Sequence, residues 1–167
     1  MDKSLQEMAA QILEKCRMRG LKLVTAESCT GGLIAATLTD IPGASDVFDR
    51  GFITYSNQAK HEMLGVSLDL IAQQGAVSEI VARHMASGAL AHSGCDIAVA
   101  VTGIAGPGGG STDKPLGLVH IAVAESTGNA RHEKCLFGAL SRTIIRQNTV
   151  IRSFEIIDAM ISAPLSA

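Results

Sequence analysis

Aromatic residues and excess charge are both scarce in this sequence. It contains no tryptophan, one tyrosine and four phenylalanines among 167 residues, so its core must be built from Ala, Val, Ile and Leu. Such a composition suits interdigitated layers of helices and sheet. The formal net charge of −2 does not indicate the excess of positive charge that binding to nucleic acid or to an acidic membrane surface requires. We therefore expect no nucleic-acid partner, whereas a small anionic ligand needs only a local cradle of donors.

Apolar runs of membrane-spanning length are lacking, and the first residues, MDKSLQEMAAQ, have no signal-peptide core. We expect a cytoplasmic protein with no membrane partner. No CxxC pair occurs, so free, buried thiols are expected; the four cysteines are Cys16, Cys29, Cys95 and Cys135. Two His-Glu pairs begin like the zinc motif HExxH, but Gly65 and Leu136 stand where the second His is required. The sequence thus predicts neither a metal nor a cofactor.

Hydrophobic periodicity predicts helices that alternate with strands. Helices are expected over 5–16, 33–40, 57–64 and 141–161, and Ser67 and Ser78 are expected to cap two more. Strands are expected within 21–26, 47–56, 96–103, 117–126 and 130–138. This order favours an α/β sandwich with helices on both faces of the sheet. With no internal repeat or linker, the chain is expected to form one domain over 1–167.

The segment TAESCTGG (Thr25–Gly32) contains three adjacent nucleophiles between an expected strand and an expected helix. The backbone N–H groups near Thr30, Gly31 and Gly32 would then lie at a helix N-terminus, where they favour a phosphate or an oxyanion. The alternative is that Ser28 or Thr30 only caps the helix. The turn is not a GxSxG nucleophile elbow, because its two glycine positions hold other residues.

Ser28 is favoured over Cys29 as the nucleophile. A catalytic thiol needs a depressed pKa and normally a histidine partner, and no feature selects one of the five histidines. A buried, structural Cys29 is therefore the simpler interpretation.

A second glycine-rich segment, TGIAGPGGG (Thr102–Gly110), follows the most apolar expected strand. Ligands of open α/β sheets bind at the carboxyl ends of strands, and glycines let backbone N–H groups approach a phosphate. The alternative is a flexible turn around Pro107. The segment is not a P-loop, because no Gly-Lys-Ser/Thr follows at the required spacing.

Four segments resemble, in order, the signatures of the CinA C-terminal domain family, also called the competence/damage-inducible protein family. They are TAESCTGG, GFITYSNQAKHEMLGV, GAVSEIVARHMASGAL and VTGIAGPGGGSTDKPLGLV. The resemblance implies an α/β fold, a three-layer α/β/α sandwich with a mixed, mostly parallel sheet of about five strands. It also implies hydrolysis of nicotinamide mononucleotide (NMN) to nicotinate mononucleotide and ammonia, the reaction of similar stand-alone members. Longer members carry a further N-terminal domain, whose activity is not transferred to this chain.

The same resemblance implies roles for individual residues. The family's serine nucleophile matches Ser28, its lysine base matches Lys60, and its tyrosine matches Tyr55, which could orient the lysine or relay a proton. The substrate-binding positions match Thr30, Gly31, Gly32, Thr102, Gly103, Ile104, Ala105, Gly106, Gly108 and Arg142.

One segment departs from the family pattern. Where the family commonly has Gly-Asp-Arg, this chain reads FGALSR, with Ser141 in place of the aspartate. Arg142 and Arg146 still offer guanidinium groups that can meet a phosphate with paired hydrogen bonds. Glu27 is expected to orient the turn, because a carboxylate paired with Lys60 would raise the pKa of the lysine and oppose its role as a base.

Two other functions compete with the amidase. A non-catalytic nucleotide-binding module in competence or the DNA-damage response would explain the glycine-rich segments, but it gives Ser28 and Lys60 no chemical task. A phosphotransferase is disfavoured by the missing P-loop lysine. For the amidase, we expect a mononucleotide as the small-molecule partner and a homo-oligomer as the assembly.

Overall fold

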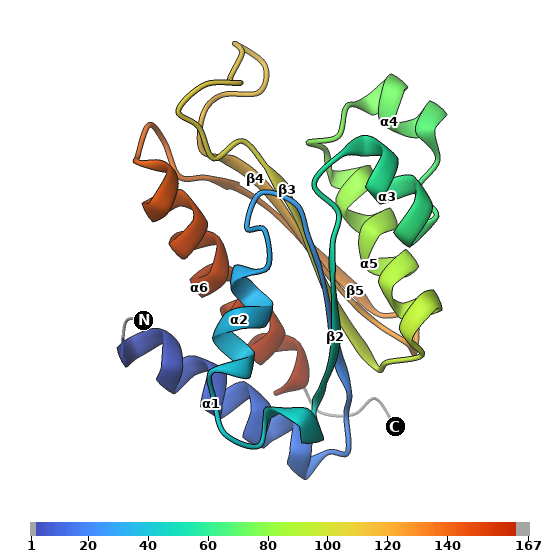
Figure 1. Cartoon of the computed structure of the whole chain (residues 1–167), viewed down its shortest axis with the longest axis vertical. Helices are drawn as coiled ribbons and strands as arrows, with labels where there is room; N and C mark the ends of the chain where they lie inside the picture. The colour runs from blue at the N-terminus through green and yellow to red at the C-terminus, as the bar shows by residue number, and fades with distance from the viewer. Residues whose placement is uncertain (1–2, 163–167) are drawn as a thin grey trace.

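The computed structural model describes residues 3–162 as a five-stranded sheet between two layers of helices (Figure 1). In chain order the elements are α1 (Lys3–Met18), β1 (Leu23–Glu27), α2 (Leu33–Thr39), the 3-10 turn η1 (Ala44–Asp46), β2 (Phe48–Ile53), α3 (Asn57–Leu64), α4 (Leu68–Gln74), α5 (Glu79–Ser93), β3 (Ile97–Gly103), β4 (Leu118–Glu125), β5 (Ala130–Leu136) and α6 (Arg142–Ile161). Helices α1, α2 and α6 cover one face of the sheet, and α3, α4 and α5 cover the other (Figure 1). The expected α/β/α sandwich is confirmed.

The strand order is β2-β1-β3-β4-β5. Strand β1 is parallel to both β2 and β3, whereas β3–β4 and β4–β5 are antiparallel. The sheet is therefore mixed, as expected, but evenly divided rather than mostly parallel. The reason is that β3, β4 and β5 follow one another without an intervening helix, so that the chain reverses directly and pairs in antiparallel fashion.

The sheet separates two hydrophobic cores. Leu23 belongs to the core beneath α1, α2 and α6, whereas Val24 and Ala26 belong to the core beneath α3, α4 and α5. Successive strand residues point to opposite faces of a sheet, which produces this separation along β1. Both cores are aliphatic, and Phe154 is the one fully buried aromatic residue within 3–162. The composition had indicated such a core.

Serine hydroxyls cap four of the helices. Ser67 and Ser78 accept hydrogen bonds from the backbone N–H three residues later, at 3.3 and 3.4 Å, so both expected caps are confirmed. Ser56 caps α3 and Ser141 caps α6 in the same way. Because Ser56 fixes the first turn of α3, it also fixes where Lys60 stands one turn later. Between residues 3 and 162 no helix is long and apolar enough to cross a membrane.

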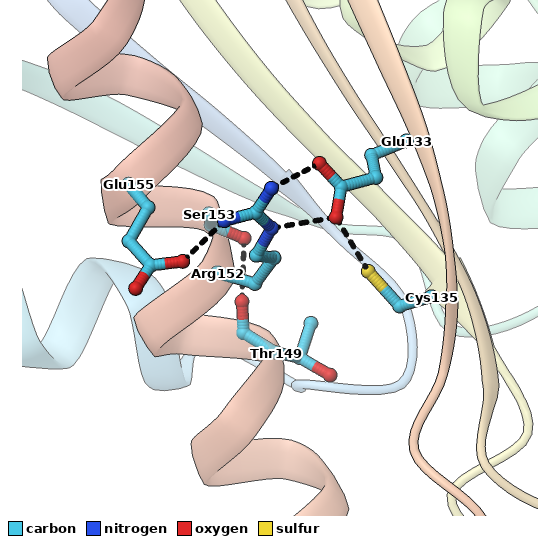
Figure 2. Close-up of polar contacts among 6 residues, drawn as sticks. All are labelled: Glu133, Cys135, Thr149, Arg152, Ser153 and Glu155. Atoms are coloured by element: carbon cyan, nitrogen blue, oxygen red, sulfur yellow. Dashed lines mark hydrogen bonds and ion pairs between the residues drawn. The ribbon is translucent and has the colours of Figure 1, made fainter.

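A polar cluster joins the edge strand β5 to α6 (Figure 2). Arg152 donates to both carboxylate oxygens of Glu133 and to Glu155, and the Cys135 thiol donates to Glu133 at 3.7 Å. A cavity of about 310 Å³ lies beside these groups. Partly exposed ion pairs of this kind contribute up to about 1 kcal/mol each. The cluster holds β5 against α6, and two strands separate it from β1.

Candidate active site

At the end of β1, the side chains of Glu27 and Cys29 point to one face of the sheet and that of Ser28 points to the other. Ser28 continues the ladder beyond β1, because its N–H donates to Val101 O at 3.1 Å. It follows Ala26 by two residues, so its side chain points to the layer of α3, as strand alternation requires. Cys29 packs instead in the core on the opposite face.

Lys60 reaches Ser28 from α3. Its Nζ lies 3.0 Å from Ser28 Oγ and 2.9 Å from Thr54 O, although 32 residues separate the lysine from the serine. The lysine is 1% exposed and the serine 9%. Burial lowers the pKa of the Lys60 ammonium, because the charged form loses its hydration. Within 3–162, no carboxylate forms an ion pair with Lys60, and the neighbouring Cys29 offsets the effect of burial only in part.

Tyr55 lies away from this contact. It is 58% exposed, and its hydroxyl accepts a hydrogen bond from Arg142 Nη2 at 2.7 Å. The group that orients the Lys60 amine is the carbonyl of the preceding residue, Thr54. The idea that Tyr55 orients the lysine therefore does not match this geometry. Sequence reasoning missed Thr54 because a backbone carbonyl leaves no signal in residue type.

Glu27 orients the turn, as expected. Its side chain is fully buried; Oε2 accepts from Gly32 N and Ile34 N, both at 3.0 Å, and Oε1 accepts from Ala35 N at 2.9 Å. The start of α2 is therefore capped from within the protein and is not open to a phosphate or an oxyanion. This corrects the expectation that the first N–H groups of the helix face a ligand.

Two other N–H groups of the turn have no backbone acceptor. Gly31 N donates to Ser28 O at 3.0 Å, whereas the N–H groups of Cys29 and Thr30 donate to no backbone carbonyl within the part of the chain that the structure describes. These two directly follow Ser28. An oxyanion at Ser28 would find its donors in these two groups, so that of the expected donors at Thr30, Gly31 and Gly32 only Thr30 remains.

The Cys29 thiol is unsuited to nucleophilic attack. It is buried, and burial raises its pKa to about 12, because a thiolate would lose its hydration. The thiol is therefore protonated at neutral pH. The other three cysteines are also free and buried, as expected.

The first residues of the glycine-rich segment make structural contacts around the start of the β3–β4 connection. Thr102 Oγ1 donates to Ala76 O at 2.8 Å, and Ile104 N donates to Leu118 O at 2.8 Å. A Cβ at Gly103 would lie 2.6 Å from a methyl group of Val119, so this glycine is required by strand packing. Ala105 is buried in the core; these four residues, Thr102, Gly103, Ile104 and Ala105, therefore have structural partners of their own.

The next two glycines of the segment differ, because a Cβ at Gly106 would overlap Leu116 Cδ1, whereas nothing lies within 4 Å of the Cβ position at Gly108. Gly106 O accepts a hydrogen bond from Arg142 Nη1 at 2.9 Å. Arg142 thus connects the glycine-rich segment to Tyr55. Arg146, one turn further along α6, donates from Nη2 to Thr30 O at 2.6 Å. Arg146 therefore borders the Ser28 turn, and Arg142 lies one turn earlier on the same face of α6.

Comparison with known proteins identifies the family of the chain. The family model of the CinA C-terminal domain matches residues 5–161. The chain belongs to this family. Over 154 residues it is 47% identical to the nicotinamide-nucleotide amidohydrolase PncC of Enterobacter agglomerans. This match covers 92% of this chain and 93% of that protein.

Other members of the family carry competence-related names. The chain is 47% identical over 156 residues to a putative competence-damage inducible protein of Acetivibrio thermocellus, but it spans only 37% of that longer protein. The crystal structure of the competence/damage inducible protein CihA from Agrobacterium tumefaciens has a TM-score of 0.94 at 49% identity, with 96% of this chain and 97% of that chain covered. The family and the fold expected from the sequence are both confirmed.

Proposed function

We propose that this CinA-family protein is an amidohydrolase that converts NMN to nicotinate mononucleotide and ammonia. The observation that carries the proposal is the contact of 3.0 Å between Ser28 Oγ and the buried Lys60 Nζ. A buried amine without a carboxylate partner is a base suited to a serine hydroxyl. Similarity over nearly the whole length of a nicotinamide-nucleotide amidohydrolase supports the choice of substrate.

In the first half of the reaction, the neutral Lys60 amine takes the proton of the Ser28 hydroxyl. Thr54 O holds the amine by one N–H, which leaves its lone pair directed to Ser28. The serine oxygen attacks the carboxamide carbon of the nicotinamide ring, and the N–H groups of Cys29 and Thr30 stabilise the oxyanion. The Lys60 ammonium then returns the proton to the departing nitrogen, the C–N bond breaks, and ammonia leaves an acyl-serine.

In the second half, Lys60 takes a proton from water, and the hydroxide attacks the acyl-serine. The lysine returns this proton to Ser28 Oγ as the ester bond breaks, which releases the carboxylate product. Arg146, which contacts the turn, and Arg142, one turn earlier on α6, can meet the substrate phosphate with paired hydrogen bonds. For Arg142 this requires that the guanidinium exchange Gly106 O or Tyr55 Oη for the phosphate.

The test is to incubate the purified protein with NMN and to separate the products by chromatography. We expect nicotinate mononucleotide and an equal amount of ammonia. Ser28→Ala and Lys60→Ala should each lower the rate by at least about a thousandfold, since both groups act in the same steps. Ser153→Ala is the matched control, because it removes a buried serine hydroxyl that binds only Thr149 O within α6. A Ser28→Ala protein with the rate of the wild type would refute the mechanism.

A non-catalytic nucleotide-binding module predicts a different result in the same assay. Such a protein would bind NMN, which calorimetry measures, and leave it unchanged. No residue in this alternative requires the contact between Ser28 and Lys60, so the amidase is the function that the site supports best.

A further inference from the structure

Glu27 provides an unusual cap for helix α2. The residue that precedes the helix is Gly32, which has φ +95° and no side chain with which to cap. The carboxylate of Glu27, five to eight residues earlier in the chain, instead accepts from the N–H groups of Gly32, Ile34 and Ala35. The positive end of the helix dipole and three N–H donors together compensate a carboxylate that has no ion-pair partner within 3–162.

The backbone of Glu27 reaches the second half of the site. Glu27 O accepts a hydrogen bond from Thr54 N at 2.8 Å, and Thr54 O accepts one from Lys60 Nζ at 2.9 Å. The side chain of Glu27 thus fixes the turn that carries Ser28, and its carbonyl fixes the residue that holds Lys60. Ser28 and Lys60, which form the 3.0 Å contact, are therefore both held by hydrogen bonds that lead back to Glu27.

From these contacts we infer that Glu27 is a positioning residue for the Ser28–Lys60 pair, an inference that rests on the proposed function. Glu27 acts from the opposite face of the sheet and touches neither the lysine nor the substrate. It holds the turn closed around Gly31 and Gly32, so that the N–H groups of Cys29 and Thr30 stay directed to the place where the oxyanion forms. Displacement of reacting groups by about 1 Å costs on the order of a hundredfold in rate.

Glu27→Gln is the sharpest substitution. Glutamine has the length of glutamate, but it keeps one acceptor oxygen and turns an NH₂ group toward a backbone N–H. At least one of the three hydrogen bonds is lost, and the turn must shift to separate the two donors. Glu27→Asp keeps the charge but withdraws the carboxylate by one methylene, so it reaches fewer of the three N–H groups.

Thr37→Val is the matched control. Thr37 is fully buried in the same helix, and its hydroxyl donates to Leu33 O at 2.7 Å. The substitution removes a buried hydrogen bond from α2 and changes no contact of the turn. It reports the cost of loosening α2 alone.

The experiment measures two quantities on the full chain. The first is kcat and KM for NMN. The second is the rate at which a small fluorophosphonate labels Ser28, followed by mass spectrometry, which depends on the serine, its base and the oxyanion donors but not on recognition of a nucleotide. We expect Glu27→Gln to lower both kcat and the labelling rate by about a hundredfold, with KM within about threefold of the wild type. Thr37→Val should leave both rates within about threefold of the wild type.

The outcomes separate this inference from the proposed function. Wild-type protein that labels at Ser28 without hydrolysing NMN, while Glu27→Gln labels slowly, supports the positioning role and rejects the substrate. Folded Glu27→Gln that matches Thr37→Val in kcat and labelling rate overturns the positioning role. If Glu27→Gln does not fold by circular dichroism, Glu27→Asp gives the decision: a loss confined to kcat and labelling supports the role, and unchanged rates overturn it.

Discussion

Replacing Lys60 by Met tests whether the amine is uncharged in the folded protein. Methionine keeps an unbranched apolar side chain but cannot bind a proton. Burial lowers the pKa of Lys60 in the fold, whereas an unfolded lysine has a pKa of about 10.4. Between these two values the unfolded chain binds more protons than the native protein. The free energy of unfolding of the wild type therefore rises with pH in this window, by up to about 1.4 kcal/mol per pH unit.

This argument gives a magnitude for the substitution. Between two pH values that lie below about 10.4, the pKa of an unfolded lysine, and at which the folded lysine is neutral, the wild type gains about 1.4 kcal/mol per pH unit relative to Lys60→Met. All other titrating groups are shared by the two proteins, so their contributions cancel in the difference. At the lower pH the variant also loses the hydrogen bonds to Ser28 and Thr54, at about 1 kcal/mol each, but it no longer carries the cost of a desolvated amine.

The assay is urea denaturation followed by circular dichroism at the two pH values, with the NMN hydrolysis rate measured in parallel. We expect the two stability curves to diverge in favour of the wild type as pH rises, and the variant to be inactive. Parallel curves would refute the reasoning. They would mean that Lys60 remains protonated in the fold and cannot take a proton from Ser28.

Three further outcomes are expected. Cys29→Ser should keep kcat within about threefold of the wild type, because the pKa of the buried thiol is raised to about 12. Loss of activity in a variant that is folded by circular dichroism would instead indicate that the thiol takes part in catalysis. Burial, and next the neighbouring His132, lower the pKa of His120 to about 4, against about 6.5 in an unfolded chain. The fold should therefore lose up to about 3 kcal/mol as pH falls from about 6.5 to about 4, and His120→Gln should show a smaller loss in urea titrations. Nicotinate mononucleotide should raise Tm more than an equal concentration of free nicotinamide; equal shifts would contradict the phosphate contacts assigned to Arg142 and Arg146.

Periodicity and turn chemistry sufficed to predict most of the architecture. The alternation of helices and strands, the caps at Ser67 and Ser78 and the aliphatic core are all present. These features depend on local sequence, so the sequence carries them directly. The even division of strand pairs depends on which strands become neighbours, and composition does not encode that.

The site was predictable in its residue types but not in its hydrogen bonds. Ser28 and Lys60 could be named from the family resemblance, and strand alternation now explains why Ser28 rather than Cys29 meets the lysine. The N–H of Thr30 was among the expected donors, but the loss of Gly32 N could not be foreseen, because the buried carboxylate of Glu27 accepts from it. Backbone groups such as Thr54 O and the N–H of Thr30 leave no signal in residue type.

The polar groups without partners gather where the chemistry is proposed. Within the described chain, four buried side-chain atoms lack a hydrogen bond, and three of them belong to Thr30, Thr54 and Arg146. Two of these residues contact each other, since Arg146 donates to Thr30 O, and the third holds Lys60 through its carbonyl. A buried polar group without a partner costs about 1–3 kcal/mol. These unpartnered groups, beside a desolvated lysine, make the fold less stable here than in its aliphatic core. Such a pattern is typical of a site organised for a ligand rather than for packing alone.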